Sequence, residues 1–306
     1  MKKNKKLTMQ EQMKYFAAIL FLLIFMPILC TVLLSGRSSL KVSQISELEQ
    51  LLPSIVYREI PDNYRMETIC AQAVLARSRV WYEYKKSDYD QKTYDQILEK
   101  NLEYERSHHL KTDKLLKCKE AVQQTKGCVL SYGGNVIPAP FCRASNGWTR
   151  GGKEVLKSDD YGWLVGVESK DDLDYLPKRK SLSFTNDDLY EKFKTLDQNQ
   201  QLNKDDIVDH IDLVSEDSSG YAMEVDVSGI KVPGEVFREM LGLPSSSFSF
   251  SKKNDKLLIT CRGTGHGMGM SQYGANHMAK DGKSWRDILN FYFPNAQIMK
   301  QKKKLK

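Results

Sequence analysis

The segment GTGHGMGMSQYGANHMAKDG, residues 263–282, constrains the fold of this chain more than any other. Its glycines stand at every second position: Gly263, Gly265, Gly267 and Gly269. Such glycines permit positive φ and carry no side chain, so another molecule can approach the backbone closely. Ser271 then predicts the N-cap of a helix running through Met278, whose free N–H groups face the same space. We therefore expect a ligand-binding loop around His266, and a tight turn without a ligand is the alternative.

Apart from its ends, the chain has the composition of a globular protein. Its 306 residues are 41% hydrophobic and 28% charged, which suffices for one large or two ordinary domains with a core. The formal net charge is +7, but ten lysines lie in the two tails, and 36 basic and 38 acidic residues remain without those tails. A nucleic-acid partner needs a basic surface on the folded domain. The sequence therefore argues against nucleic-acid binding.

The N-terminal region contains twenty consecutive uncharged residues, 15–34, preceded by five lysines. This length spans the hydrocarbon core of a bilayer as a helix, and the lysines predict a cytoplasmic N-terminus. We expect a cytoplasmic tail (1–14), a retained transmembrane anchor, a linker (35–45), an external folded domain (46–298) and a basic tail (299–306). A cleaved signal peptide is the alternative, although no small-x-small cleavage site follows the apolar run.

The spacing of apolar residues in the predicted external domain predicts a mixed α+β fold. Apolar residues recur every three or four positions over 65–86, which indicates a helix with one buried face, and a second helical region covers roughly 93–124. Gly133-Gly134-Asn135 predicts a β-hairpin between Cys128–Tyr132 and Val136–Cys142.

The second half of the chain adds short strands and one more helix. We expect strands over Tyr221–Val227 and Leu257–Cys261, with a helix from near Pro233 to Leu241 between them. The polar run 171–210 has the composition of a surface subdomain. Helices and strands in separate runs favour the α+β class.

Three segments together resemble the stage II sporulation protein D family. GHGMGMSQYGA, then MAKDG and a short helix ending in YFP, resembles the family's C-terminal signature. REIPDNYRMETICAQAVLARSRVWYEY, residues 58–84, resembles its N-terminal signature, with departures at Cys70 and Ser78. NVIPAPFCRASNGWT resembles its hairpin and serine-glycine loop, with departures at Asn146 and Trp148.

This resemblance implies a two-lobed α+β domain, preceded by the transmembrane helix, with a central cleft between the helix at 65–86 and the loop at 263–273. It also implies a lytic transglycosylase that cleaves the MurNAc–GlcNAc bond of peptidoglycan and leaves a 1,6-anhydro end. One carboxyl group suffices, because it first protonates the leaving oxygen and then accepts a proton from the sugar's own C6 hydroxyl, whereas ordinary glycosidases need two carboxylates.

The family's catalytic acid matches Glu67 of this chain. That carboxyl must carry its proton when the sugar arrives, and a poorly solvated pocket favours this. The alternative is an ordinary carboxylate in the first turn of a helix, where the helix dipole favours negative charge. Nine further residues are candidates for substrate binding, each with a structural role as the alternative: Gln72, Arg77, Ser145, Thr149, His266, Gly267, Ser271, Gln272 and Tyr273.

The resemblance also bears on metals and partners. Some family members hold zinc near the hairpin, and here Cys128 and Cys142 could form either a disulfide or two ligands of a structural zinc ion. We expect no metal or cofactor to be required for the chemistry. The expected partners are glycan strands without stem peptides, a cell-wall amidase and other engulfment membrane proteins, in the space between mother cell and forespore. A non-catalytic glycan-binding enhancer of an amidase is the alternative function.

Overall fold

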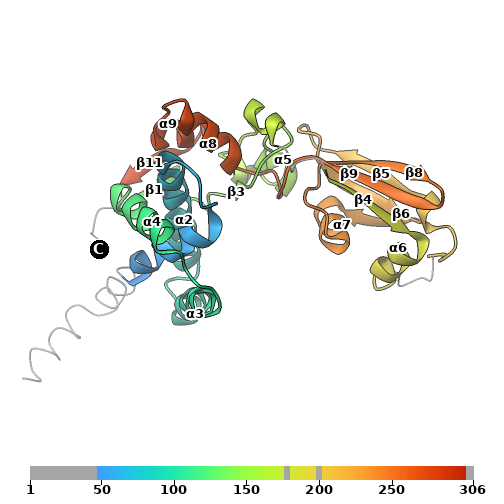
Figure 1. Cartoon of the computed structure of the whole chain (residues 1–306), viewed down its shortest axis with the longest axis horizontal. Coiled ribbons are helices and arrows are strands. Elements are labelled where there is room, and N and C mark those ends of the chain that lie inside the picture. Colours follow the sequence, from blue (N-terminus) through green and yellow to red (C-terminus); the bar gives the residue numbers. More distant parts are fainter. Residues whose placement is uncertain (1–46, 176–179, 198–201, 301–306) are drawn as a thin grey trace, which may run out of the picture. The chain divides into compact units, whose positions relative to one another are not determined.

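The computed structural model describes residues 47–175, 180–197 and 202–300. The chain divides into two compact units, Met1–Gln50 with Lys302–Lys306, and Leu51–Gln301. The predicted tails, linker and membrane span fall largely or wholly outside the described residues, whereas nearly all of the described residues belong to the second unit. The second unit begins with a helix over 51–59, which is followed by the elements labelled in Figure 1.

The second unit is α+β, but the predicted fold class was wrong in adding a transmembrane helix. Within 47–175, 180–197 and 202–300, no helix is long and apolar enough to cross a membrane. The longest described helix, α2 (Met66–Lys86), has 21 residues but includes Arg77 and ends in Lys85 and Lys86. The predicted span itself, 15–34, lies outside the described residues.

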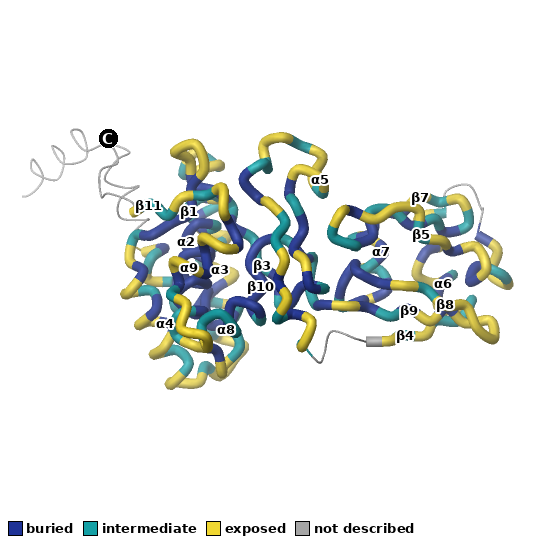
Figure 2. Tube along the Cα trace, turned by 90° about the horizontal axis from the view of Figure 1, so that it is seen from above, coloured by how far each residue is buried: buried dark blue, intermediate teal, exposed yellow. Residues whose placement is uncertain are grey.

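Helix α2 is the centre of the helical part, as its apolar spacing predicts. Ile69, Cys70, Ala73 and Val80 of the predicted face are at most 3% exposed, and Figure 2 shows much of α2 in the colour of buried residues. The helix packs against α4 (Thr112–Gln124), β1 (Cys128–Tyr132), α8 (Gln272–Lys280) and α9 (Trp285–Tyr292). The region predicted as helical over 93–124 is two helices, α4 and α3 (Gln91–Ser107), because 108–111 leave the helix.

The predicted hairpin is present but short. Strand β1 pairs with β2 (Asn135–Val136) around Gly133-Gly134, and on its other edge with β11 (Gln297–Lys300). Strand β3 (Phe141–Cys142) leaves this sheet and pairs in parallel with β10 (Met270–Ser271). Phe141 and Cys142, predicted to end the hairpin, are therefore paired with Met270 and Ser271, directly after the alternating glycines.

Two further sheets enclose one hydrophobic core. One sheet has the order β4 (Lys180–Thr185), β9 (Lys256–Cys261), β8 (Phe248–Lys253). The other has the order β5 (Ile211–Glu216), β6 (Ala222–Val227), β7 (Ile230–Pro233). The remaining α-helices of the described chain are α5 (Gly152–Leu156), α6 (Asn186–Phe193) and α7 (Gly234–Leu241), and α6 and α7 lie beside these strands in Figure 1.

The polar run 171–210 contributes to this core, contrary to its expected surface role. Leu189 and Phe193 of α6 are fully buried in it, and the Phe193 ring stacks on Phe237 with centroids 5.4 Å apart. The charged residues of α6 itself, Asp187, Asp188, Glu191 and Lys192, are exposed, so α6 is a short amphipathic helix. The high average polarity of the run did not reveal this apolar face, because a helix of two turns needs only a few apolar residues to pack against a core.

Candidate active site

Glu67 is partly exposed in the first turn of α2, and the tertiary structure fixes one of its carboxyl oxygens. Oε2 accepts a hydrogen bond of 2.6 Å from the backbone N–H of Trp285 at the start of α9. The first N–H groups of a helix lack partners within that helix, and a carboxylate is a favourable acceptor for them. Glu67 thus belongs to α2 and also caps α9.

The predicted residues Gln72 and Gln272 meet in the interior, beside Glu59. Gln272 Nε2 donates to Gln72 Oε1 (3.1 Å) and to the backbone oxygen of Glu59 (2.8 Å). Gln72 Nε2 donates to the Glu59 carboxylate at 2.9 Å. Both glutamines are at most 1% exposed, so their amides bind other parts of the protein. The helix at 65–86 and the segment after the glycines do lie side by side, and substrate contact by either glutamine stays a prediction.

A buried carboxyl group that was not among the predicted site residues joins Ser145 to Ser271. Asp172 is fully buried and accepts hydrogen bonds from the Ser145 backbone N–H (2.9 Å), the Ser145 hydroxyl (2.5 Å) and the Ser271 hydroxyl (2.6 Å). Burial raises the pKa of Asp172, and these hydrogen bonds oppose the increase. Ser271 also accepts from the Gly274 N–H, which confirms it as the N-cap of α8.

The raised pKa of Asp172 makes the stability of the protein depend on pH. Between the ordinary carboxyl pKa of 3.8 and the raised value, the folded state binds more protons than the unfolded state. The contribution of Asp172 therefore favours folding at low pH and is lost as the pH rises through its folded-state pKa.

We expect the Asp172→Asn variant to lack this dependence, because an amide is neutral and can still accept from Ser145 and donate to Ser271. Urea unfolding from pH 4 to pH 8 should show the parent losing stability relative to Asp172→Asn as the pH rises. A constant difference would mean that Asp172 is ionised throughout and that its hydrogen bonds outweigh burial.

Arg77 lies in the interior, where it joins three elements. Its guanidinium donates to the backbone oxygens of Thr125 (2.9 Å), Cys128 (3.2 Å) and Val122 (3.1 Å), and the residue is 0% exposed. These bonds tie α2 to the end of α4 and the start of β1. They describe a structural role, and the predicted contact of Arg77 with substrate remains untested.

His266 and Gly267 belong to a second cluster, centred on the buried Arg150, whereas the Thr149 hydroxyl accepts the Val167 N–H at 2.9 Å. Arg150 donates to the backbone oxygen of His266 (3.2 Å) and pairs with Asp217 (2.5 Å) and Glu235 (2.7 Å). Burial lowers the pKa of His266, and the Glu235 carboxylate opposes that decrease. His266 Nδ1 accepts the N–H of Met268 at 3.0 Å. No local pattern in the sequence marks Arg150 as the centre of this cluster.

Two aromatic side chains, one in α8 and one in the loop before α5, remain accessible. The Tyr273 ring is partly exposed, with centroids 5.0 Å from Tyr175 and 4.5 Å from His277. Trp148 is 49% exposed. Exposed aromatic rings can stack on sugars, so Tyr273 keeps its predicted role as a proposal.

The alternating glycines are required by contacts within the protein. All four have positive φ, between 73° and 103°. A Cβ on Gly269 would lie 2.1 Å from the Pro140 backbone oxygen, and one on Gly267 would lie 2.4 Å from the Tyr221 ring. The close approach that the sequence predicted is thus made by other parts of this chain.

We expect Gly269→Ala to destabilise the fold by about 2 kcal/mol more than Gly133→Ala. Both positions have positive φ, but a Cβ at Gly133 meets no atom within 4 Å, so only the first substitution forces the backbone apart. Urea midpoints of the two variants measure the difference. Equal midpoints would show that the backbone at Pro140 moves aside at little cost in free energy.

The structure does not place Cys128 and Cys142 across one hairpin. Cys128 lies in β1 and Cys142 in β3, which belong to different sheets. None of the described cysteines forms a disulfide, and no group of three or more potential metal ligands occurs among the described residues. These two cysteines do not fit a zinc site on this geometry, and metal binding stays an untested prediction.

Comparison with known proteins places the chain in a family. A family model described as Stage II sporulation protein matches residues 36–132. Stage II sporulation protein D of Bacillus subtilis (strain 168) is 30% identical over 263 residues, which cover 82% of this chain and 74% of that protein. The protein of the same name from Bacillus amyloliquefaciens is 30% identical over 265 residues, with the same coverage. The amidase enhancer of Bacillus subtilis (strain 168) is 28% identical over 230 residues, which cover 58% of this chain and 32% of the enhancer. Since the similarity to the first two proteins extends over most of both sequences, the chain belongs to the stage II sporulation protein D family.

Proposed function

We propose that this protein acts on the cell wall during sporulation, as a lytic transglycosylase that cleaves peptidoglycan glycan strands with Glu67 as its acid. The observation that carries the proposal is the partly exposed Glu67 carboxyl, held by the Trp285 N–H within a segment that matches the family's N-terminal signature. Membership of a family whose relatives are named for stage II of sporulation supports the cellular setting.

In this proposal, Glu67 performs two proton transfers. The Trp285 N–H holds Oε2, which leaves Oε1 free to turn toward the glycosidic oxygen and protonate it. The resulting carboxylate then accepts the proton of the C6 hydroxyl, whose oxygen attacks C1 and closes the 1,6-anhydro ring. Proton donation by a positioned acid typically contributes about 10²–10⁴-fold to the rate.

The test is to incubate the purified full-length protein with sacculi from which an amidase has removed the stem peptides. We expect MurNAc residues with 1,6-anhydro ends among the products, identified by mass spectrometry. Reducing ends formed by water would indicate hydrolysis instead. If no ends are released from either amidase-treated or untreated sacculi, the protein is not a glycan-cleaving enzyme.

A second candidate is a glycan-binding protein that stimulates a cell-wall amidase. Two observations favour it: the likeness to an amidase enhancer, and the helix-capping contact of Glu67, which gives that carboxyl a structural use without catalysis. In this case, adding the protein to a cell-wall amidase should speed the release of stem peptides from sacculi without producing anhydro ends.

A further inference from the structure

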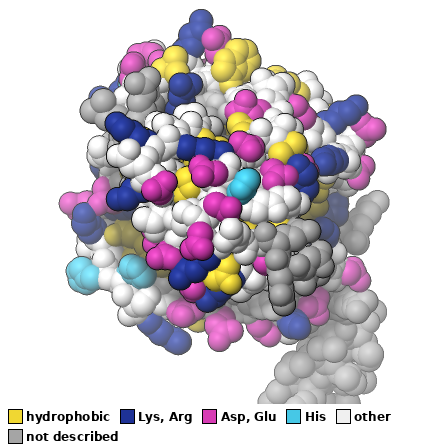
Figure 3. Space-filling model, turned by 90° about the vertical axis from the view of Figure 1, so that its right-hand side faces the viewer, with side chains coloured by type: hydrophobic (Ala, Val, Ile, Leu, Met, Phe, Trp, Pro, Cys, Tyr) yellow, Lys and Arg dark blue, Asp and Glu magenta, His cyan; other side chains and the backbone are white. Residues whose placement is uncertain are grey.

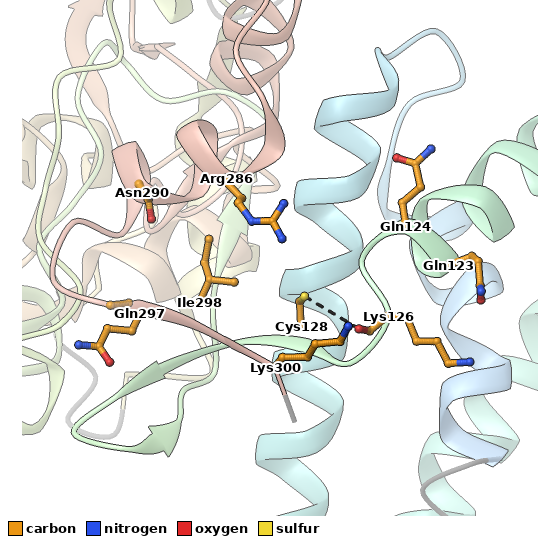
Figure 4. Close-up of a pocket in the computed structure, with 10 residues that line it drawn as sticks. Gln123, Gln124, Lys126, Cys128, Arg286, Asn290, Gln297, Ile298 and Lys300 are labelled. Carbon is orange, nitrogen blue, oxygen red and sulfur yellow. Dashed lines mark hydrogen bonds between the residues drawn. The ribbon is translucent and has the colours of Figure 1, made fainter. Parts of the chain in front are cut away.

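A cavity of about 540 Å³ opens where α4, β1, α9 and β11 meet (Figure 4). The end of α4 contributes Gln123 and Gln124, and α9 contributes Arg286. Lys126 lies in the turn before β1, and Lys300 ends β11. A second cavity, of about 430 Å³, is lined by Asp62 and residues 111–117, so neither of these two cavities is lined by the 263–273 loop.

The first cavity is lined by cations without matching anions. Lys126, Arg286 and Lys300 line it together with side-chain amides, and no aspartate or glutamate does. Across the described part of the chain, none of the recorded ion pairs includes these three cations. By contrast, the face in Figure 3 has basic and acidic side chains interspersed. Cations that line one concavity attract an anion to it.

Two contacts connect the lining of this cavity to the proposed acid. Arg286 directly follows Trp285, whose N–H is hydrogen-bonded to Glu67. On the other side, the thiol of Cys70, one helical turn after Glu67, donates to Gln124 Oε1 at 3.4 Å. The start of α9 and the first turns of α2 therefore connect Glu67 to the lining of this positively charged cavity.

We propose that this cavity is a subsite that binds a carboxylate of the glycan strand next to the sugar at Glu67. The inference rests on the proposed glycan substrate. Each MurNAc bears a lactyl group that ends in a free carboxylate when no peptide is attached, and an attached stem peptide carries carboxylates of its own. Arg286 matches the planar shape of a carboxylate, the two lysines add charge, and the amides can bind neighbouring hydroxyl groups.

The test compares two triple variants of the full-length protein with equal loss of charge. The subsite variant carries Lys126→Gln, Arg286→Gln and Lys300→Gln. The control carries Lys92→Gln, Lys100→Gln and Lys119→Gln, at exposed helix positions that do not line the cavity. Binding is measured to peptide-free strands, to the same strands with their carboxylates converted to methylamides, and to peptide-bearing strands, at low and high salt.

We expect the parent and the control to bind peptide-free strands about tenfold or more tightly than amidated strands, with the preference reduced by salt. The subsite variant should bind both strands equally, at the parent's affinity for the amidated strand. If the parent prefers peptide-bearing strands and the subsite variant does not, the bound carboxylate belongs to the peptide.

Two results would overturn the subsite and can be told apart from failure of the proposed function. If the parent binds free and amidated strands equally, glycan binding stands but the subsite does not. If the control loses the preference as much as the subsite variant, the effect is one of net charge. If the parent binds no strand, the glycan substrate itself is wrong.

Discussion

Replacing Glu67 by glutamine is expected to reduce the formation of anhydro ends by about 10²–10⁴-fold. Glutamine has nearly the shape of glutamate, and its amide oxygen can still accept the Trp285 N–H that Oε2 accepts at 2.6 Å. The amide can neither release nor accept the catalytic proton. The substitution therefore removes the chemistry while it keeps the cap of α9. Single-turnover release of anhydro-MurNAc from amidase-treated strands measures the effect.

Glu83→Gln is the matched control, because Glu83 lies in the same helix with its side chain 49% exposed and its pairing with Arg79 is long, at 3.9 Å. We expect it to leave the rate unchanged. Glu67→Gln should also retain the parent's melting temperature and its affinity for glycan strands. A Glu67→Gln protein that cleaves at the parental rate would refute Glu67 as the acid, and a variant that merely unfolds would reveal a structural carboxylate.

Arg77→Met is expected to lower the free energy of unfolding by about 3–5 kcal/mol, the largest effect on stability that we predict. Methionine fills much of the same volume but leaves the backbone oxygens of Thr125, Cys128 and Val122 without the bonds that the guanidinium donates. These buried acceptors cannot turn to water, so the cost of desolvating them is no longer offset. Urea unfolding, with Arg77→Lys as a partial replacement, measures the loss.

Arg106→Met supplies the comparison for Arg77, because Arg106 is exposed near the end of α3 and its replacement should change stability by less than about 0.5 kcal/mol. Arg77→Lys should recover only part of the loss, since an ammonium group cannot reproduce the fixed geometry of three guanidinium bonds. If Arg77→Met keeps its stability and loses glycan binding, the sequence prediction of substrate contact is correct and the structural interpretation fails.

Local signals explain the parts of the fold that the sequence predicted well. Helix α2 followed from apolar spacing, and the start of α8 from Ser271, because periodicity and capping depend on residues within a few positions of one another. Helix α6 was missed in the polar run 171–210, since its packing depends on Phe237, more than 40 residues away.

The site was predictable in its residue types but not in its contacts. The amide pair Gln72 and Gln272 was named from the two motifs, and the structure brings the two residues to 3.1 Å. Asp172 could not be found, because nothing in its own segment indicates that two serines from distant loops will converge on it.

By itself, the sequence determined the family, the main helix, the capped helix after the glycines and the identity of the proposed acid, since each of these depends on short patterns of residues. Only the tertiary structure decided which atoms meet. It directed the amide of Gln72 and the guanidinium of Arg77 inward, placed Pro140 and Tyr221 against the glycines, and gathered three cations around one cavity. The reason is that burial and hydrogen bonding are satisfied between segments far apart in the chain, whose partners no local pattern records.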